Sequence, residues 1–296
     1  MGVLKQIQNI AVIPNLTKKD AFSTTLQVLS RLKKLSVQAL MTKHYQSHFQ
    51  SSDIIFCDTV ETLCQSADMV LTIGGDGTIL HAALHASFFH KPLLGINTGT
   101  LGFAAELETD ELDMLSRLVS GDYTIEKRMM LHIEHHTAKG KREFRAMNDA
   151  VISRGSLSRL IDIDVSLAPE RGYICSYRAD GLIISTPTGS SAYSLAAGGP
   201  VVEPTMKCIL MTPVCSHSLF ARPVVFSHHS ELSVSASCDD ETEVYLTIDG
   251  AITVTVQKED TILISTAQTE TEFIKLKDRT FYKILNDKFT EKGRQL

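Results

Sequence analysis

One short segment combines glycines with a carboxylate in a pattern that suits phosphate chemistry. Residues 74–78, Gly-Gly-Asp-Gly-Thr, follow the apolar run 69–73 and precede the helical pattern 79–83. Glycines at a strand-to-helix turn let the backbone approach a ligand closely, and the N–H groups at the start of the helix attract phosphate. The segment is neither G-x-G-x-x-G nor a P-loop. It predicts a phosphate-binding turn of another kind.

Asp76 is the residue of this turn that could carry out a reaction. A carboxylate inside a phosphate-binding turn repels its ligand unless it holds a metal ion or takes a proton from a hydroxyl group, and both roles occur in phosphoryl transfer. The alternative is an aspartate that caps the next helix, a common position for this residue type. We interpret Asp76 as catalytic, with Gly74 and Gly75 as the glycines that approach the phosphates.

Two further segments have the composition of ligand-binding turns. Residues 97–103, Asn-Thr-Gly-Thr-Leu-Gly-Phe, follow the apolar run 92–96, and doubly wound folds bind ligands at such carboxyl ends of strands. A plain connection with turn glycines is the alternative there. In residues 180–200 a strand leads into Thr-Pro-Thr-Gly-Ser-Ser and a short helix. Its hydroxyl and N–H groups could contact a purine edge or a ribose, and Tyr193 offers a stacking face.

The elements that position these turns fall into two patterns. Up to residue 122, buried apolar strands alternate with helical periodicity, which predicts a doubly wound parallel α/β sheet. From 123 to 275, short segments of alternating hydrophobicity predict a β-rich domain. Residues 276–296 form a polar, helix-compatible tail that could pack back on the first domain. We expect the active site in the cleft between the two domains.

Composition excludes several classes of protein. A chain of 296 residues, 43% hydrophobic and 21% charged, has room for two globular domains, and its net charge of −5 argues against general binding to nucleic acid or anionic membranes. The six cysteines form no C-x-x-C pair, which favours reduced thiols over a disulfide framework or a zinc ribbon. No apolar run is as long as a signal-peptide core or a membrane span. These features predict a cytoplasmic protein.

Taken together, the motifs are similar to those of a known family. Residues 74–78, 97–103, 148–149 (Asn-Asp) and 180–200 resemble, in order, the signature segments of the NAD kinase family in its bacterial type, and the resemblance spans about residues 10–265. Lipid kinases and phosphofructokinases share the glycine-aspartate turn, whereas the Thr-Pro-Thr-Gly-Ser-Ser-Ala-Tyr run is specific. The resemblance implies an enzyme that transfers the γ-phosphoryl group of ATP to the adenosine 2′-hydroxyl of NAD, giving NADP and ADP.

The resemblance also implies roles for single residues. Asp76 would be the acid-base residue that acts on the 2′-hydroxyl. Asn148 and Asp149 would hold ribose hydroxyls and the adenine, although the family usually has Glu where Asp149 stands, and Asp180 would lie on the nicotinamide side. In full, the residues expected to contact NAD or ATP are Gly77, His81, Asn148, Asp149, Arg159, Arg178, Asp180, Thr188, Ser191, Ala192, Tyr193, Ser194, Leu195 and Ala196.

For several of these residues a second interpretation stays open. His81 could be a solvated histidine on the helix face that it shares with His85, and Arg159 or Arg178 could be solvated or ion-paired. Ala251 follows Asp-Gly at a position where family members often have Gln. The substrate contact that the Gln makes in the family is therefore not expected here.

The family likeness implies Mg²⁺ or another divalent cation as cofactor, and a homodimer or homotetramer. The motifs are equally compatible with ATP or polyphosphate as donor and with NADH as acceptor, and they name no metal ligands. The alternatives are a lipid kinase that shares the glycine-aspartate turn, and a catalytically silent NAD-binding regulator. A lipid kinase would need an apolar groove or an interfacial patch, and no basic amphipathic helix is visible in the sequence. For a silent binder, a carboxylate such as Asp76 beside phosphate would be electrostatically costly without chemistry.

Overall fold

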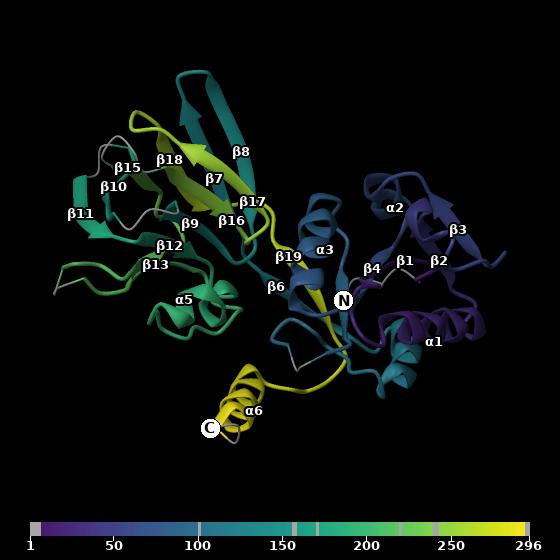
Figure 1. Cartoon of the computed structure of the whole chain (residues 1–296). Helices are drawn as coiled ribbons and strands as arrows, with labels where there is room; N and C mark the ends of the chain where they lie inside the picture. The colour runs from purple at the N-terminus through teal and green to yellow at the C-terminus, as the bar shows by residue number, and fades with distance from the viewer. Residues whose placement is uncertain are drawn as a thin grey trace. The chain divides into compact units, whose positions relative to one another are not determined.

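The computed structural model describes residues 7–99, 102–155, 159–169, 172–218, 221–238 and 243–293. The chain divides into two compact units, one made of the described residues up to Lys127 and from Thr271 onward, the other of Arg128–Glu270. Figure 1 shows most of the helices in the first unit, whereas strands make up nearly all of the second.

The first unit is built on a seven-stranded sheet. Strands β1, β2, β3, β4 and β5 pair in parallel, and β19 also runs parallel to β5. Every residue of β4 is buried, as expected for a strand that is covered on both faces. In spatial order the strands are β3 (Ile54–Cys57), β2 (Gln38–Thr42), β1 (Asn9–Pro14), β4 (Met69–Gly74), β5 (Leu93–Asn97), β19 (Thr271–Lys275) and β6 (Thr124–Arg128).

Helices cover both faces of this sheet. Helix α1 packs against η2, while α2 packs against α3, and Figure 1 shows the two pairs on opposite sides of the strands. The helical segments are α1 (Ala21–Lys34), η1 (Lys43–Tyr45), α2 (Val60–Ser66), α3 (Asp76–Phe88), η2 (Leu112–Leu115), α4 (Ser116–Ser120) and α6 (Phe281–Gly293). Within the described residues, no helix is long and apolar enough to cross a membrane.

The second unit consists of two antiparallel six-stranded sheets. One sheet has the order β11 (Gly172–Ala179), β10 (Ile161–Leu167), β15 (Leu232–Ser237), β18 (Thr261–Thr266), β7 (Leu131–Thr137), β8 (Gly140–Ala146). The other has the order β14 (Val224–Ser227), β13 (Cys208–Val214), β12 (Gly181–Ser185), β9 (Asp149–Arg154), β16 (Val244–Ile248), β17 (Ile252–Val256). Apolar residues of both sheets, such as Ile163 and Ile152, share one buried core. A short connection after β12 carries η3 (Gly189–Ser191) and α5 (Tyr193–Ala196).

The predicted fold class, an α/β part with a doubly wound parallel sheet followed by a β-rich part, is confirmed. The unit boundaries differ from those expected at 122/123 and 275/276, because β6 and β19 both belong to the sheet of the first unit. A strand shows the same alternating hydrophobicity whether it joins the sheet of the first unit or a sheet of the second. The pattern of residues 271–275 therefore could not reveal that the chain returns to the first sheet there.

Candidate active site

The glycine-aspartate turn joins the carboxyl end of β4 to helix α3. Helix α3 begins at Asp76, directly after Gly75, and the first N–H groups of a helix have no partner within the helix. A Cβ added to Gly75 or to Gly77 would meet nothing within 4 Å among the described residues. Packing among the described residues therefore does not require glycine at these two positions, and the close approach of a ligand stays the predicted reason for them.

The loop after β5 holds the Asp76 carboxylate. The Phe103 N–H donates to Asp76 Oδ2 over 2.9 Å, and the Ala104 N–H donates to Oδ1 over 3.2 Å. A Cβ at Gly102 would lie well inside 3.0 Å of Oδ1, so this carboxylate fits only against a glycine there. The structure thus brings together two of the predicted segments, 74–78 and 97–103, although Thr100 and Leu101 lie outside the described residues.

Segments distant in sequence support this loop. The buried carboxylate of Glu106 accepts hydrogen bonds from the N–H groups of Leu276 and Lys277, each over 2.8 Å, and pairs with Lys275. The ring of Phe281 at the start of α6 lies 6.1 Å from that of Phe103. None of these supporting residues is predicted from the sequence, because no local pattern connects Glu106 to residues about 170 positions later.

His81 lies one turn along α3 from Gly77, and its side chain is exposed. Its ring centroid is 5.2 Å from that of His85, whose pKa is lowered by burial and by the neighbouring His81. Across the described parts of the chain, no three or more His, Cys, Asp or Glu side chains are grouped so that they could hold a metal ion. The role of His81 as a substrate contact stays a prediction.

In the second unit, Asn148 and Asp149 lie at the start of β9, beside the turn that follows β12. The Thr186 N–H donates to the Asn148 carbonyl over 2.9 Å, and the Thr186 hydroxyl donates to the Met147 carbonyl over 2.6 Å. A Cβ at Gly189 would overlap the Asn148 carbonyl oxygen. The predicted residues at 148–149 and at 188–196 therefore lie at neighbouring ends of two adjacent strands, the start of β9 and the connection that follows β12.

Asp249 binds the same segment from its other side. Its carboxylate accepts hydrogen bonds from the N–H groups of Met147, Asn148 and Asp149, over 2.8, 2.7 and 3.0 Å. At 249–251 the sequence indicates only that Gln is absent at 251, and it does not reveal this contact of the Asp249 carboxylate. Asp-Gly between two β-branched runs does predict a hairpin turn, but not that its side chain reaches back 100 residues.

The turn after β12 uses several of its hydroxyl groups internally. Ser190 is fully buried and donates to the Pro187 carbonyl over 2.6 Å, while Ser194 and Thr212 share a buried hydrogen bond of 2.9 Å. Ser194 was expected to line the ligand site, but the structure gives its hydroxyl an internal partner. The buried hydroxyl of Thr188, by contrast, has no partner among the described residues, and the Tyr193 side chain is 48% exposed.

Of the charged residues predicted to contact the substrate, Asp180 is held in an ion pair, whereas Arg178 and Arg159 have exposed side chains. Asp180 precedes β12, and its Oδ1 accepts a hydrogen bond from Arg154 Nε over 2.6 Å, an ion pair that the sequence did not suggest. Arg178 lies near the end of β11 with an exposed side chain, and Arg159 is exposed just before β10. The contacts of the two arginines with substrate stay predictions.

Two family models cover most of the chain. Residues 10–123 match the ATP-NAD kinase N-terminal domain, and residues 147–276 match the ATP-NAD kinase C-terminal domain. The chain belongs to the NAD kinase family. A NAD kinase of Moorella thermoacetica is 36% identical over 97% of this chain and 91% of its own length. One of Caldanaerobacter subterraneus subsp. tengcongensis is 35% identical over 97% of this chain and all of its own length.

Solved structures of the NAD kinase family have the same fold. Yeast NADH kinase, crystallised with NADH, superposes with a TM-score of 0.84 at 24% identity, covering 95% of this chain and 87% of the yeast one. A NAD kinase from Archaeoglobus fulgidus, crystallised with ATP, superposes with a TM-score of 0.73 at 22% identity, covering 94% and 98%. Family membership confirms the predicted function, NAD kinase activity, and the prediction of an enzyme.

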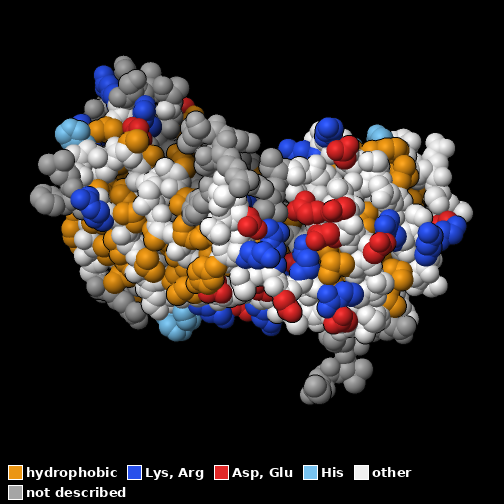
Figure 2. Space-filling model, turned by 90° about the horizontal axis from the view of Figure 1, so that it is seen from below, with side chains coloured by type: hydrophobic (Ala, Val, Ile, Leu, Met, Phe, Trp, Pro, Cys, Tyr) orange, Lys and Arg blue, Asp and Glu red, His pale blue; other side chains and the backbone are white. Residues whose placement is uncertain are grey.

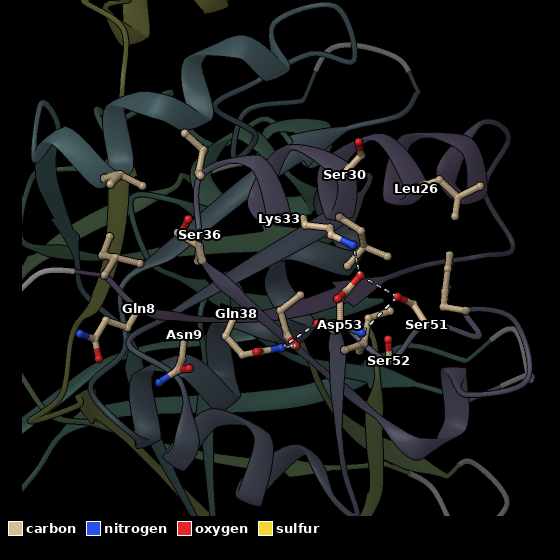
Figure 3. A pocket seen from close by; sticks show the side chains of 18 of the residues that line it. Gln8, Asn9, Leu26, Ser30, Lys33, Ser36, Gln38, Ser51, Ser52 and Asp53 are labelled. Carbon is tan, nitrogen blue, oxygen red and sulfur yellow. Dashed lines mark hydrogen bonds and ion pairs between the residues drawn. The ribbon is translucent and has the colours of Figure 1, made fainter.

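A cavity elsewhere in the first unit is separate from the residues of this NAD kinase site. It has a volume of about 880 Å³ and opens beside α1, where Gln8, Gln38 and Ile54 mark the amino ends of β1, β2 and β3 (Figure 3). Asp76 follows the carboxyl end of β4, and these strands are parallel, so the cavity lies at the opposite edge of the sheet. Its polar groups also bond one another, as Lys33 and Asp53 do over 2.5 Å.

Asp149 has a raised pKa that should appear in the pH dependence of stability. Burial, and secondarily the charge of Asp249, raise the pKa of Asp149 from 3.8 to about 7. The folded state therefore holds this proton more tightly than the unfolded state, so the stability it contributes is complete below pH 4 and is lost as pH rises through about 7.

Replacing Asp149 by Asn removes this titration. We expect Asp149→Asn to melt at roughly the wild-type temperature at pH 4 and roughly 5 °C above it at pH 8. Thermal unfolding at the two pH values measures the difference. An equal difference in melting temperature between Asp149→Asn and the wild type at pH 4 and at pH 8 would contradict the raised pKa of Asp149.

Gly189→Ala should damage the site in the second unit. The new methyl group would overlap the Asn148 carbonyl oxygen, and such overpacking costs about 1–3 kcal/mol. We expect a lower melting temperature and weaker NAD binding, measured by thermal unfolding and calorimetry. Gly75→Ala, whose methyl group would have free space, serves as the control for stability and should melt as the wild type does.

Proposed function

We propose that the chain transfers the γ-phosphoryl group of ATP to the 2′-hydroxyl of the adenosine ribose of NAD, with Asp76 as the base. The observation that carries this proposal is the Asp76 carboxylate at the start of α3, oriented by the N–H groups of Phe103 and Ala104. The α3 N-terminus attracts phosphate oxygens, while the fixed carboxylate accepts the proton that the hydroxyl loses on attack.

The residues of the second unit would hold the dinucleotide. The side chains of Asn148 and Asp149 would accept and donate hydrogen bonds at the ribose and adenine, with the unpartnered Thr188 hydroxyl beside them. Ala192 would leave room for the base, and the exposed ring of Tyr193 offers it a stacking face. Asp180, oriented by Arg154, would contact the nicotinamide side.

A divalent cation such as Mg²⁺ would neutralise charge on the transferred phosphoryl group when bound. The described residues contain no cluster of metal-ligating side chains, so a protein cage for the ion does not fit them. They do fit an ion held chiefly by the phosphates of ATP and by water, because Mg²⁺ retains several waters and often takes one or two carboxylates at most.

The test is an end-point assay of the purified protein with NAD, ATP and Mg²⁺, in which an NADP-specific dehydrogenase detects the product. Parallel wells with NADH and with polyphosphate determine whether these replace NAD and ATP. We expect NADP to form with ATP and NAD. A folded protein that binds NAD but forms no NADP with either donor would be a silent binder, and failure to bind NAD would reopen the lipid-kinase alternative.

We further propose a cytoplasmic enzyme that assembles as a homodimer or homotetramer. Hydrophobic side chains gather on one face of the β-rich unit, whereas charged side chains of both signs are interspersed on the α/β unit (Figure 2). On the edge strand β14, Val225 is 53% exposed, and Met206, just before the neighbouring strand β13, is also 53% exposed. An exposed apolar sheet edge favours association with another copy. Light scattering coupled to size-exclusion chromatography measures the number of subunits.

A further inference from the structure

The carboxylate of Asp249 bonds three consecutive backbone N–H groups at the predicted NAD site. Asp249 lies in the hairpin between β16 and β17, where it and Gly250 both have positive φ, as in a type I′ turn. Its Oδ2 accepts from Met147, and its Oδ1 accepts from both Asn148 and Asp149. In return, the Asp249 N–H donates to the Asp149 carbonyl over 3.0 Å. The left-handed backbone at Asp249 turns the carboxylate toward this segment.

The segment 147–149 is therefore bonded on both sides. Its N–H groups donate to Asp249, and two of its carbonyls, those of Met147 and Asn148, accept from Thr186. Hydrogen bonds to a carboxylate are stronger than those between neutral groups, so the bonds to Asp249 hold the segment more strongly than the bonds from Thr186 do. Asn148 and Asp149 are the two residues whose side chains would contact the adenosine, and their backbone position depends on these bonds.

We propose that Asp249 is a positioning residue for NAD: its carboxylate fixes the backbone of residues 147–149, and its negative charge acts on the neighbouring Asp149. This inference rests on the proposed binding of NAD by Asn148 and Asp149. Asp249 itself does not contact the substrate in this proposal, and it acts through its two neighbours.

The charge of Asp249 beside Asp149 predicts a change in the pH dependence of NAD binding when Asp249 is replaced. A purely structural role of Asp249 would not produce that change. Burial and the charge of Asp249 raise the pKa of Asp149 to about 7, and Asp249 is the charged group of the described residues that acts on it. Burial raises the pKa of Asp249, while its three backbone N–H bonds oppose that change. Removing the Asp249 charge must therefore lower the pKa of Asp149, so that Asp149 stays ionised to lower pH.

The experiment measures the dissociation constant of NAD by calorimetry between pH 5 and 9 for the wild type, Asp249→Asn and Asp260→Asn. Asp249→Asn retains one oxygen for Asn148 and Asp149 but turns an amide N–H₂ toward the Met147 N–H. We expect NAD to bind about tenfold more weakly, and the pH at which binding changes, near 7 in the wild type, to move to lower pH. Size-exclusion elution and thermal unfolding verify that each variant is folded.

Asp260→Asn is the matched control. Asp260 is another buried aspartate in a turn of the same unit, between β17 and β18, and its carboxylate accepts bonds from the Gln257 N–H over 2.9 Å and His135 Nε2 over 2.8 Å. Its replacement should lower the melting temperature and leave both NAD affinity and its pH dependence unchanged. If both variants changed NAD binding alike, or if Asp249→Asn changed neither quantity, the positioning role would be overturned.

Two further comparisons cover the case in which Asp249→Asn does not fold and separate the positioning role from the proposed reaction. If Asp249→Asn does not fold, the wild type and Asp149→Asn are compared: the change in NAD affinity near pH 7 must vanish in Asp149→Asn, and its persistence overturns the proposal. Because binding is measured without turnover, a wild type that binds NAD but forms no NADP contradicts the proposed reaction alone. An unchanged affinity in Asp249→Asn, with NADP formed, contradicts the positioning role alone.

Discussion

Asp76→Asn should lose 10²- to 10⁴-fold in kcat, about the contribution of a general base, while NAD binds within about threefold of the wild-type affinity. The amide has nearly the shape of the carboxylate and can still accept one of the two N–H bonds from Phe103 and Ala104. It cannot take the proton of the attacking hydroxyl. Steady-state assay of NADP formation gives kcat, and calorimetry gives the affinity for NAD.

The matched control for this variant is Asp113→Asn. Asp113 belongs to the same unit, and its side chain is 92% exposed in an ion pair with Arg31, where little stabilisation is expected. Its replacement should leave kcat unchanged. Near-wild-type turnover in Asp76→Asn would show that Asp76 is not the base, whereas loss of NAD affinity without loss of kcat would make it a binding residue.

Gly102→Ala should reduce kcat by about 100-fold without touching the substrate-binding residues of the second unit. The added methyl group would occupy the position of Asp76 Oδ1, so either the carboxylate or the loop that carries Phe103 must move. A displacement of about 1 Å at a reacting group costs on the order of 100-fold in rate. Gly99→Ala, in the same loop, meets only Asn97 Oδ1 at 4.0 Å among the described atoms and should be far milder.

The double variant Gly102→Ala/Asp76→Asn separates this mechanism from general damage. If Gly102→Ala acts by displacing Asp76, the double variant should have nearly the kcat of Asp76→Asn, because the second change has no functional carboxylate left to displace. Multiplied losses would instead mean that the alanine harms the site independently of Asp76. Thermal unfolding of the four proteins accounts for any change in the folded fraction.

Much of the fold could be predicted from local patterns. The apolar runs that became β1, β4 and β5, and the alternating segments that became β7, β10 and β16, are each readable within five to seven residues. What a strand pairs with is not local, and this is why β6 and β19 were assigned to the β-rich part although they complete the first sheet. The residues of a strand alternate between a buried and an exposed face whichever neighbouring strands it pairs with, so the alternation does not identify the sheet.

The candidate site divides in the same way. The sequence by itself determined the family, because the run of hydroxyl residues after β12 is a specific local combination. It also predicted the chemistry at Asp76, because a carboxylate between glycines at a strand-to-helix turn suits phosphoryl transfer. Only the tertiary structure decided which residues hold these turns in place: Gly102 beside Asp76, Arg154 on Asp180, and Asp249 on 147–149. Those contacts join positions 26 to 102 residues apart, so they exist only once the sheets have brought distant strands side by side.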